Sequence, residues 1–129
     1  MRIKEYRKSV SANGREKIPP CFLRKCFIIF FHNTKDYKAP RGGEELTQIC
    51  ARTRDFWEDI TSREELQDKN ILIASHGCAV RALLQNVYED ADIANFWHGK
   101  VPPNCSVNIV EIKENKAVLL EEDVVYYVR

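Results

Sequence analysis

His76 is the residue best placed for chemistry, because Ser75-His76-Gly77 lies between an apolar run and a helical pattern. Ligands of open α/β sheets bind where strands end and the next helices begin. At a helix amino end the unpaired backbone N–H groups and the helix dipole favour an anion. Gly77 has no Cβ to keep a phosphate from the backbone. The pattern predicts phosphate binding at His76 and Gly77, although a histidine that only caps the helix or bonds in the core would fit it equally.

Glu44 is the second candidate, since it follows a loop rich in Pro and Gly and opens a predicted helix. A carboxylate is expected at that position for helix capping alone. Beside a phosphate site, however, a carboxylic acid can protonate a leaving oxygen, a role that contributes about 10²–10⁴-fold to a rate. Glu44 and His76 together therefore predict acid-assisted chemistry on a phosphate ester, which requires that both face one cleft.

Two helices and a strand must position these residues. Apolar side chains at helical spacing predict helices over residues 44–60 and 78–88. Between them, residues 71–74 form a short apolar run that is typical of a parallel strand covered on both faces. The order helix, strand, turn, helix predicts an α/β domain.

The other segments carry weaker patterns. Near Pro40 a basic and poorly periodic beginning gives way to segments with clear hydrophobic periodicity. We expect a basic, weakly structured or briefly helical segment over residues 1–36 and a domain over residues 37–129. The elements expected in them are a tail over 1–17, a helix or alternatively a strand over 21–32, helical turns within 91–97, paired strands over 107–112 and 117–120, and a last strand or docked tail over 124–128.

Composition limits the function classes. The net charge of +1 hides a basic start, because residues 1–25 hold eight of the 20 Lys and Arg but only two of the 19 acids. This start lacks a dense basic block with interleaved aromatic residues, so we expect no nucleic-acid partner. The longest apolar stretch, residues 26–31, is too short to cross a bilayer, so we expect no membrane segment. Five scattered cysteines favour free thiols and a cytoplasmic location, and no His or Cys spacing predicts a metal or other cofactor.

These residues as an ensemble resemble the C-terminal part of the histidine phosphatase superfamily, the phosphoglycerate mutase-like clan. The similarity covers residues 37–127 and implies a partial three-layer α/β/α sheet with helices on both faces. It also implies that His76 contacts the phosphoryl group, that Glu44 donates or accepts the proton, and that Asn104 lies near the phosphate. Arg52 and Arg81 are expected to fix helices and loops through ion pairs. The motifs that carry the resemblance are Pro40-Arg41-Gly42-Gly43-Glu44, Arg52, Ser75-His76-Gly77 with Arg81, and Pro103-Asn104-Cys105-Ser106.

Two departures from the family pattern bear on activity. Glu45 stands where the family has a serine and puts a second acid beside the anion site. Family members also begin with a strand ending in Arg-His-Gly, whose histidine is the nucleophile, and neither His32 nor His98 lies in such a triplet. The resemblance therefore implies a truncated member with impaired phosphohistidine chemistry. A missing central strand would leave a sheet edge through which the chain could pair into a homo-oligomer.

Two function classes remain open. The first is a phosphomonoesterase or mutase acting on a phosphorylated small molecule, and the second is a non-catalytic phosphate-binding or interaction remnant of the same fold. Ser75 near a strand-to-helix turn offers a weaker serine hydrolase alternative, without the usual glycine-rich elbow. Cys78 at a helix amino end offers a reactive thiol, which is weaker still.

Overall fold

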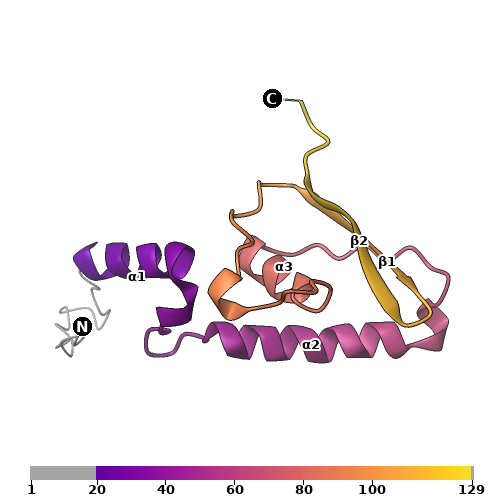
Figure 1. Ribbon diagram of the computed structural model, residues 1–129, viewed down its shortest axis with the longest axis horizontal. Coiled ribbons are helices and arrows are strands. Elements are labelled where there is room, and N and C mark those ends of the chain that lie inside the picture. The colour runs from indigo at the N-terminus through magenta and orange to yellow at the C-terminus, as the bar shows by residue number, and fades with distance from the viewer. Residues whose placement is uncertain (1–19, 129) are drawn as a thin grey trace, which may run out of the picture.

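The computed structural model describes residues 20–128, with side chains from Cys26 onward. Its longest element, α2, lies along one side of the molecule, with α3 and a β-hairpin above it and α1 beside its beginning (Figure 1). The expected tail over residues 1–17 lies outside the described residues. In chain order the elements are α1 (Pro20–His32), α2 (Leu46–Ser62), α3 (Gly77–Leu84), β1 (Val107–Lys113) and β2 (Lys116–Val124), with short 3₁₀ turns at Thr34–Asp36, Glu64–Leu66 and Ile93–Asn95.

Helix α2 begins at Leu46, two residues later than the sequence predicted. Glu45 is the residue before the first turn, and its N–H donates a 2.8 Å hydrogen bond to Oε1 of Gln48. A side chain of the first turn that accepts from the N-cap N–H in this way satisfies a backbone donor at the helix start. Glu44 therefore lies in the loop ahead of α2 and not in its first turn.

The core is small and largely aromatic. Leu46, Ala82, Phe96 and Trp97 form its buried centre. From α1, the ring of Phe31 stacks on that of Trp97 with centroids 4.9 Å apart. The indole N–H of Trp97 also donates a 2.7 Å hydrogen bond to the backbone oxygen at position 30. The prediction of a helix over residues 21–32 is confirmed, and these contacts attach it to the rest of the core.

The two strands form an antiparallel hairpin. Glu114 and Asn115 connect them and both have positive φ, 50° and 61°, as a two-residue hairpin turn with the right twist requires. In β2, side chains alternate between half-buried and exposed, so that Leu119 points inward while Leu120 is exposed. The predicted strands over 107–112 and 117–120 are thus confirmed.

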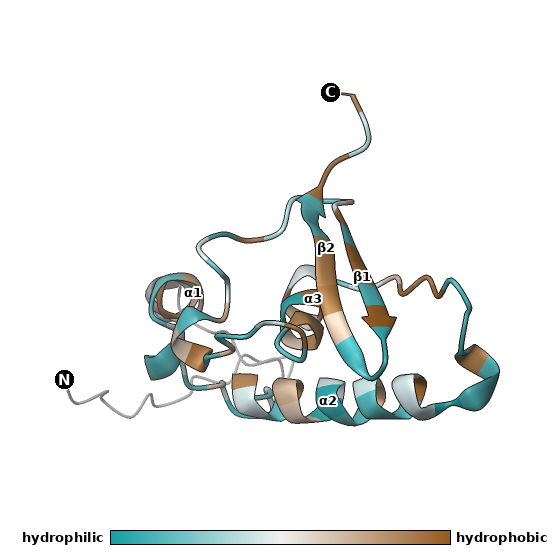
Figure 2. Ribbon diagram, turned by 45° about the vertical axis from the view of Figure 1, so that its right-hand side comes forward, coloured by the Kyte–Doolittle hydropathy of each residue, from teal (hydrophilic) through white to brown (hydrophobic). Residues whose placement is uncertain are grey.

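The predicted α/β class is confirmed, but the buried parallel strand over residues 71–74 is wrong. This segment is extended and exposed, and the exposed fraction of Leu72 is 92%. Figure 2 shows it as a hydrophobic stretch between α2 and α3. A parallel strand needs neighbours on its edges, whereas the described strands are only β1 and β2, which pair with each other.

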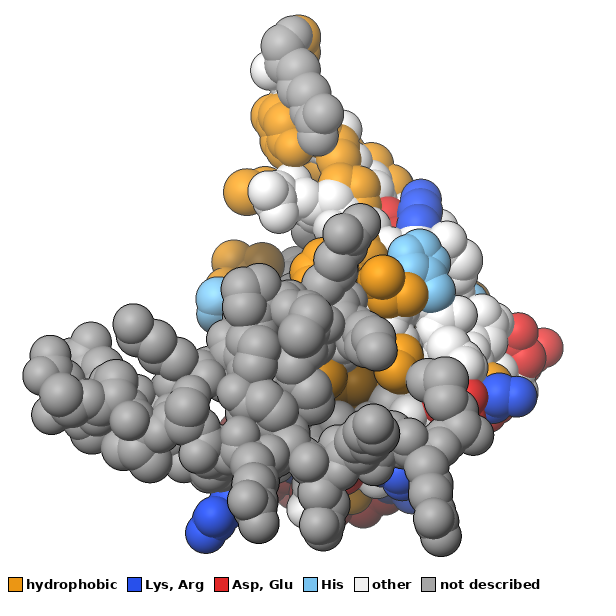
Figure 3. All heavy atoms as spheres, turned by 90° about the vertical axis from the view of Figure 1, so that its left-hand side faces the viewer, with side chains coloured by type: hydrophobic (Ala, Val, Ile, Leu, Met, Phe, Trp, Pro, Cys, Tyr) orange, Lys and Arg blue, Asp and Glu red, His pale blue; other side chains and the backbone are white. Residues whose placement is uncertain are grey.

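Two further boundaries differ from the prediction. Helix α3 ends at Leu84, and turns continue the chain to residue 87 in place of a helix to residue 88. Beyond Val124 the described residues form no strand, and Val128 is 98% exposed. Figure 3 shows hydrophobic side chains gathered along this end of the chain, at the top of the view. Of the two alternatives for residues 124–128, the last strand is therefore wrong. A docked tail agrees with the 3.0 Å hydrogen bond that the Tyr127 hydroxyl donates to the backbone oxygen of Asn104.

Candidate functional site

His76 lies directly before α3, at its amino end. Its backbone is extended, with φ −119° and ψ 154°, and its carbonyl accepts the first helical hydrogen bond from the N–H of Val80 at 2.8 Å. Its side chain is exposed and makes no capping hydrogen bond to α3. His76 is thus the N-cap residue of α3 through its backbone, but its side chain neither caps the helix nor lies in the core. The imidazole remains available to a ligand.

Gly77 is the first residue of α3, and a neighbouring loop approaches it. A Cβ at Gly77 would lie 3.9 Å from Cδ of Pro102, an ordinary van der Waals contact. Asn104 follows two residues later in this loop and is exposed, and its backbone oxygen accepts a 3.0 Å hydrogen bond from the hydroxyl of Tyr127. The fold thus brings the loop of Asn104 to the amino end of α3, where the sequence predicted phosphate binding.

Glu44 is engaged by Arg52. The guanidinium Nε donates to Oε1 at 3.1 Å and Nη2 donates to Oε2 at 3.0 Å. These hydrogen bonds and the positive charge lower the pKa of the Glu44 carboxyl, against a smaller opposing effect of burial. Both carboxylate oxygens of Glu44 are therefore engaged, and a role as proton donor would require this ion pair to open.

The Glu44–Arg52 pair lies near the start of α3. Helices α2 and α3 pack against each other. The Cys78 thiol, two residues after His76, interacts electrostatically with both Glu44 and Arg52. Burial, aided by the charges of Cys50 and Glu44, raises the pKa of Cys78 to about 11, so the structure does not support a reactive thiol. That Glu44 and His76 share one cleft stays a prediction.

Replacing Arg52 should change the titration of Glu44. In Arg52→Met the pKa of Glu44 should rise, because both hydrogen bonds and the adjacent positive charge are lost. The measurement is the side-chain carboxyl ¹³C shift of Glu44 against pH. Arg63→Met is the matched control. Arg63 is the residue after α2, and its Nη2 lies 2.5 Å from Oδ2 of Asp59, which is on that helix. An unchanged pKa of Glu44 in Arg52→Met would contradict the pairing.

Arg81 does not face a ligand site. Its side chain is fully buried, and its guanidinium binds Oε1 of Glu122 at 2.6 Å and Oδ2 of Asp123 at 2.5 Å. The hydroxyl of Tyr88 accepts a third bond from it at 2.8 Å. The expected role of Arg81 in fixing elements through ion pairs is confirmed, because these bonds join α3 to the end of β2. The sequence analysis named no partner for Arg81, although its partners lie in the acidic run 121–123.

In their contacts, the other two histidines are separate from the candidate site at the amino end of α3. His98 is half-buried and stacks on Tyr88, with ring centroids 3.6 Å apart. His32 lines a cavity beside α1. Within residues 20–128, no group of three His, Cys, Asp or Glu side chains is arranged to hold a metal ion. In the same range no helix has the length and apolar character needed to cross a membrane.

Comparisons with known proteins show the family of this chain. The family model of the histidine phosphatase superfamily (branch 1) matches residues 24–123. Residues of this chain are 26% identical to a metal-independent phosphoserine phosphatase of Arabidopsis thaliana, over 82% of this chain and 39% of the relative. They are 30% identical to phosphoglycerate mutase 1 of Saccharomyces cerevisiae, over 56% of this chain and 28% of the relative. The chain thus spans well under half the length of these relatives.

A solved structure shows the same fold. Bacillus stearothermophilus YhfR superimposes with a TM-score of 0.67 over 79% of this chain and 48% of its own, at 22% sequence identity. The superposition therefore covers most of the chain described above but only about half of the structural relative.

Proposed function

The chain belongs to the histidine phosphatase superfamily (branch 1), whose family model matches residues 24–123, and we propose from this membership that it binds phosphomonoesters at the amino end of α3 without turning them over appreciably. The observation that carries the proposal is the exposed His76 side chain beside Gly77, next to the loop of Asn104. Here an imidazole N–H and the first N–H groups of α3 would bind the phosphoryl oxygens.

Weak turnover is expected from the engagement of Glu44. Arg52 donates hydrogen bonds to both of its carboxylate oxygens, so donation of a proton to a leaving oxygen would first require this ion pair to open. The alternative is a working phosphatase or mutase, the activities that the names of the relatives carry.

Binding and turnover can be tested on the same protein. We expect titration with inorganic phosphate to shift the amide signals of residues 77–80, with binding about tenfold weaker in His76→Asn, which loses the imidazole donor. Lys69→Ala is the control, because Lys69 is exposed in the preceding loop. p-Nitrophenyl phosphate should be hydrolysed no faster than in buffer.

Two outcomes would contradict the proposal in different ways. Equal phosphate binding by His76→Asn and Lys69→Ala would remove the site from His76. Hydrolysis that is lost in His76→Asn would establish an enzyme and would direct the search for a nucleophile to His32 and His98.

We also propose that the chain pairs with a second copy through residues 71–75. This segment is extended, and the exposed fractions of Ile71, Leu72 and Ile73 are 48%, 92% and 39%. An extended apolar segment without a paired neighbour is a template for strand pairing with another chain. Two such segments would match each other, because both carry apolar side chains along their length.

A further inference from the structure

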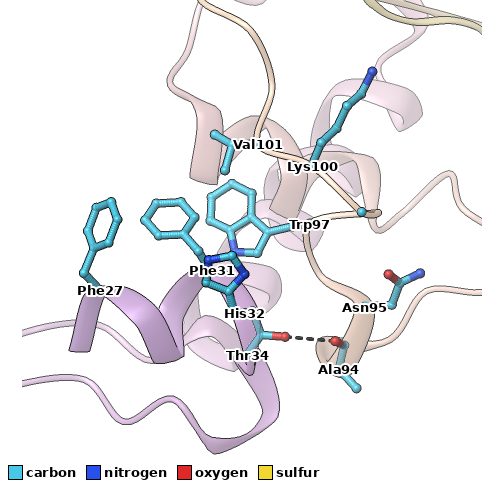
Figure 4. A pocket seen from close by; sticks show the side chains of 10 residues that line it. Phe27, Phe31, His32, Thr34, Ala94, Asn95, Trp97, Lys100 and Val101 are labelled. Carbon is cyan, nitrogen blue, oxygen red and sulfur yellow. Dashed lines mark hydrogen bonds between the residues drawn. The ribbon is translucent and has the colours of Figure 1, made fainter. Parts of the chain in front are cut away.

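A cavity lies between the end of α1 and residues 94–101 (Figure 4). Its volume is about 580 Å³, within the range of about 300–1,000 Å³ that is usual for small-molecule sites. None of the described residues that line it belongs to the candidate site at the amino end of α3, so the cavity is a separate feature. Its polar lining residues are His32, Thr34, Asn95 and Lys100.

Three aromatic rings form one wall of this cavity. The ring centroids of Phe27 and Phe31 are 4.6 Å apart, and those of Phe31 and Trp97 are 4.9 Å apart. Figure 4 shows the three rings following one another along one side. Trp97 is buried, whereas Phe27 is 64% exposed. The wall therefore offers an uncovered ring surface, on which a further aromatic ring can stack.

The buried polar groups of the lining are used within the protein. The hydroxyl of Thr34 donates to the backbone oxygen of Ala94 at 3.1 Å, and the indole N–H of Trp97 donates to the backbone oxygen at position 30. His32 and Asn95 differ, because both are exposed and their side chains make no hydrogen bond to another described residue. Their side-chain N–H groups are therefore available to a ligand.

The charge of the lining favours an anion. Among the described residues no acidic side chain lines the cavity, whereas His32 and Lys100 are basic. Nζ of Lys100 lies 3.8 Å from Oδ2 of Asp123, and in Figure 4 it points away from the rings. The donors left at the cavity are thus those of His32 and Asn95, and an ionised acceptor makes stronger hydrogen bonds to such donors than a neutral one.

We propose that this cavity binds a small aromatic carboxylic acid. Its ring stacks on the wall formed by Phe27 and Phe31, and its carboxylate accepts hydrogen bonds from His32 and Asn95. This division is typical of small-molecule sites, in which apolar walls hold most of the ligand and a few polar groups orient it. The site is independent of the proposed phosphate binding at His76.

Three probes separate the contribution of the ring from that of the charge in NMR titrations: 2-naphthoate, 2-naphthalenemethanol and acetate. We expect 2-naphthoate to bind about tenfold more tightly than 2-naphthalenemethanol, which lacks the charged acceptor. Acetate should not bind at the same concentrations, because it buries no ring. The naphthalene probes should shift the indole N–H signal of Trp97, while that of Trp57, which lines a different cavity, stays unchanged.

Variants on α1 test the two parts of the ligand separately. Phe27→Ser should weaken the binding of both naphthalene probes about fivefold, because the ring contact is lost. His32→Ala should weaken only the binding of 2-naphthoate, also about fivefold, because it removes a donor to the carboxylate. Ile28→Ser is the matched control, since Ile28 is the neighbour of Phe27 on α1, is 49% exposed and does not line the cavity.

Several results would overturn the inference: no binding of 2-naphthoate, equal binding of 2-naphthoate and 2-naphthalenemethanol, or equal losses in Phe27→Ser and Ile28→Ser. Displacement of 2-naphthoate by inorganic phosphate would also overturn it, because the acid would then occupy the phosphate site and not this cavity. Phosphate binding at His76 is measured in its own titration, so its failure would leave the aromatic acid site intact.

Discussion

Arg81→Met should lower the free energy of unfolding by about 3–5 kcal/mol, the cost of breaking a buried ion pair by removing one partner. Arg81 and the side chain of Asp123 are both fully buried, so the variant leaves a carboxylate without its cation inside the protein. Domains of this kind are stable by only about 5–15 kcal/mol, so a large part of the stability is at stake. The measurement is urea unfolding followed by far-UV circular dichroism.

Two comparisons separate the buried ion pair from a general effect of losing an arginine. Arg52→Met removes an exposed arginine that is also ion-paired and should cause no measurable loss. The double variant Arg81→Met with Asp123→Asn should lose less than the sum of its two single variants, because the orphaned charge is gone. A loss in Arg81→Met no larger than that in Arg52→Met would contradict the structure.

The same network should make stability depend on acid pH. Burial raises the pKa of Glu122, but hydrogen bonds from Tyr88 and Arg81 outweigh it and hold that pKa below the usual value of 4.5. Because the folded pKa is the lower one, the contribution of Glu122 is complete above the unfolded pKa and is lost as the pH falls through the folded pKa. The difference between wild type and Arg81→Met should therefore shrink below about pH 4.5 and be constant at neutral pH.

Local patterns made much of the fold predictable from the sequence. Leu46 and Thr53 are buried on α2, as the helical spacing of apolar residues indicated. The hairpin was predictable because Glu114 and Asn115 separate two segments of strand-forming residues. The exposed segment 71–74 was not, because an apolar run becomes a buried strand only when other strands cover its edges. That condition depends on partners distant in sequence, about which a local pattern says nothing.

The candidate site was likewise predictable from the sequence only in part. His76 was placed correctly at the amino end of a helix, because Ser75-His76-Gly77 and the pattern after it are contiguous. The engagement of both Glu44 oxygens by Arg52 was not predicted, because it depends on two side-chain conformations that spacing alone does not determine. The partners of Arg81 lie 41 and 42 residues away, and only the folded chain reveals them.

Self-association should respond strongly to a charge at the exposed segment. We expect the wild-type chain to sediment as dimers or larger species at micromolar concentration, and Leu72→Lys to sediment largely as a monomer. Leu72 is 92% exposed, so lysine costs the folded chain little. In a pairing of two such segments, however, it would place like charges opposite each other, and natural edge strands use lysine against association in this way.

Sedimentation velocity of a matched variant decides whether self-association depends on residues 71–75 or on exposed apolar surface in general. Val128→Lys removes an apolar residue that is 98% exposed but lies outside residues 71–75. If association proceeds through the extended segment, Val128→Lys should sediment like the wild type. A monomeric wild type, or equal dissociation of both variants, would contradict pairing through residues 71–75. The first result would mean that the exposed apolar side chains of this segment do not drive association, and the second that association depends on exposed apolar surface in general and not on this segment.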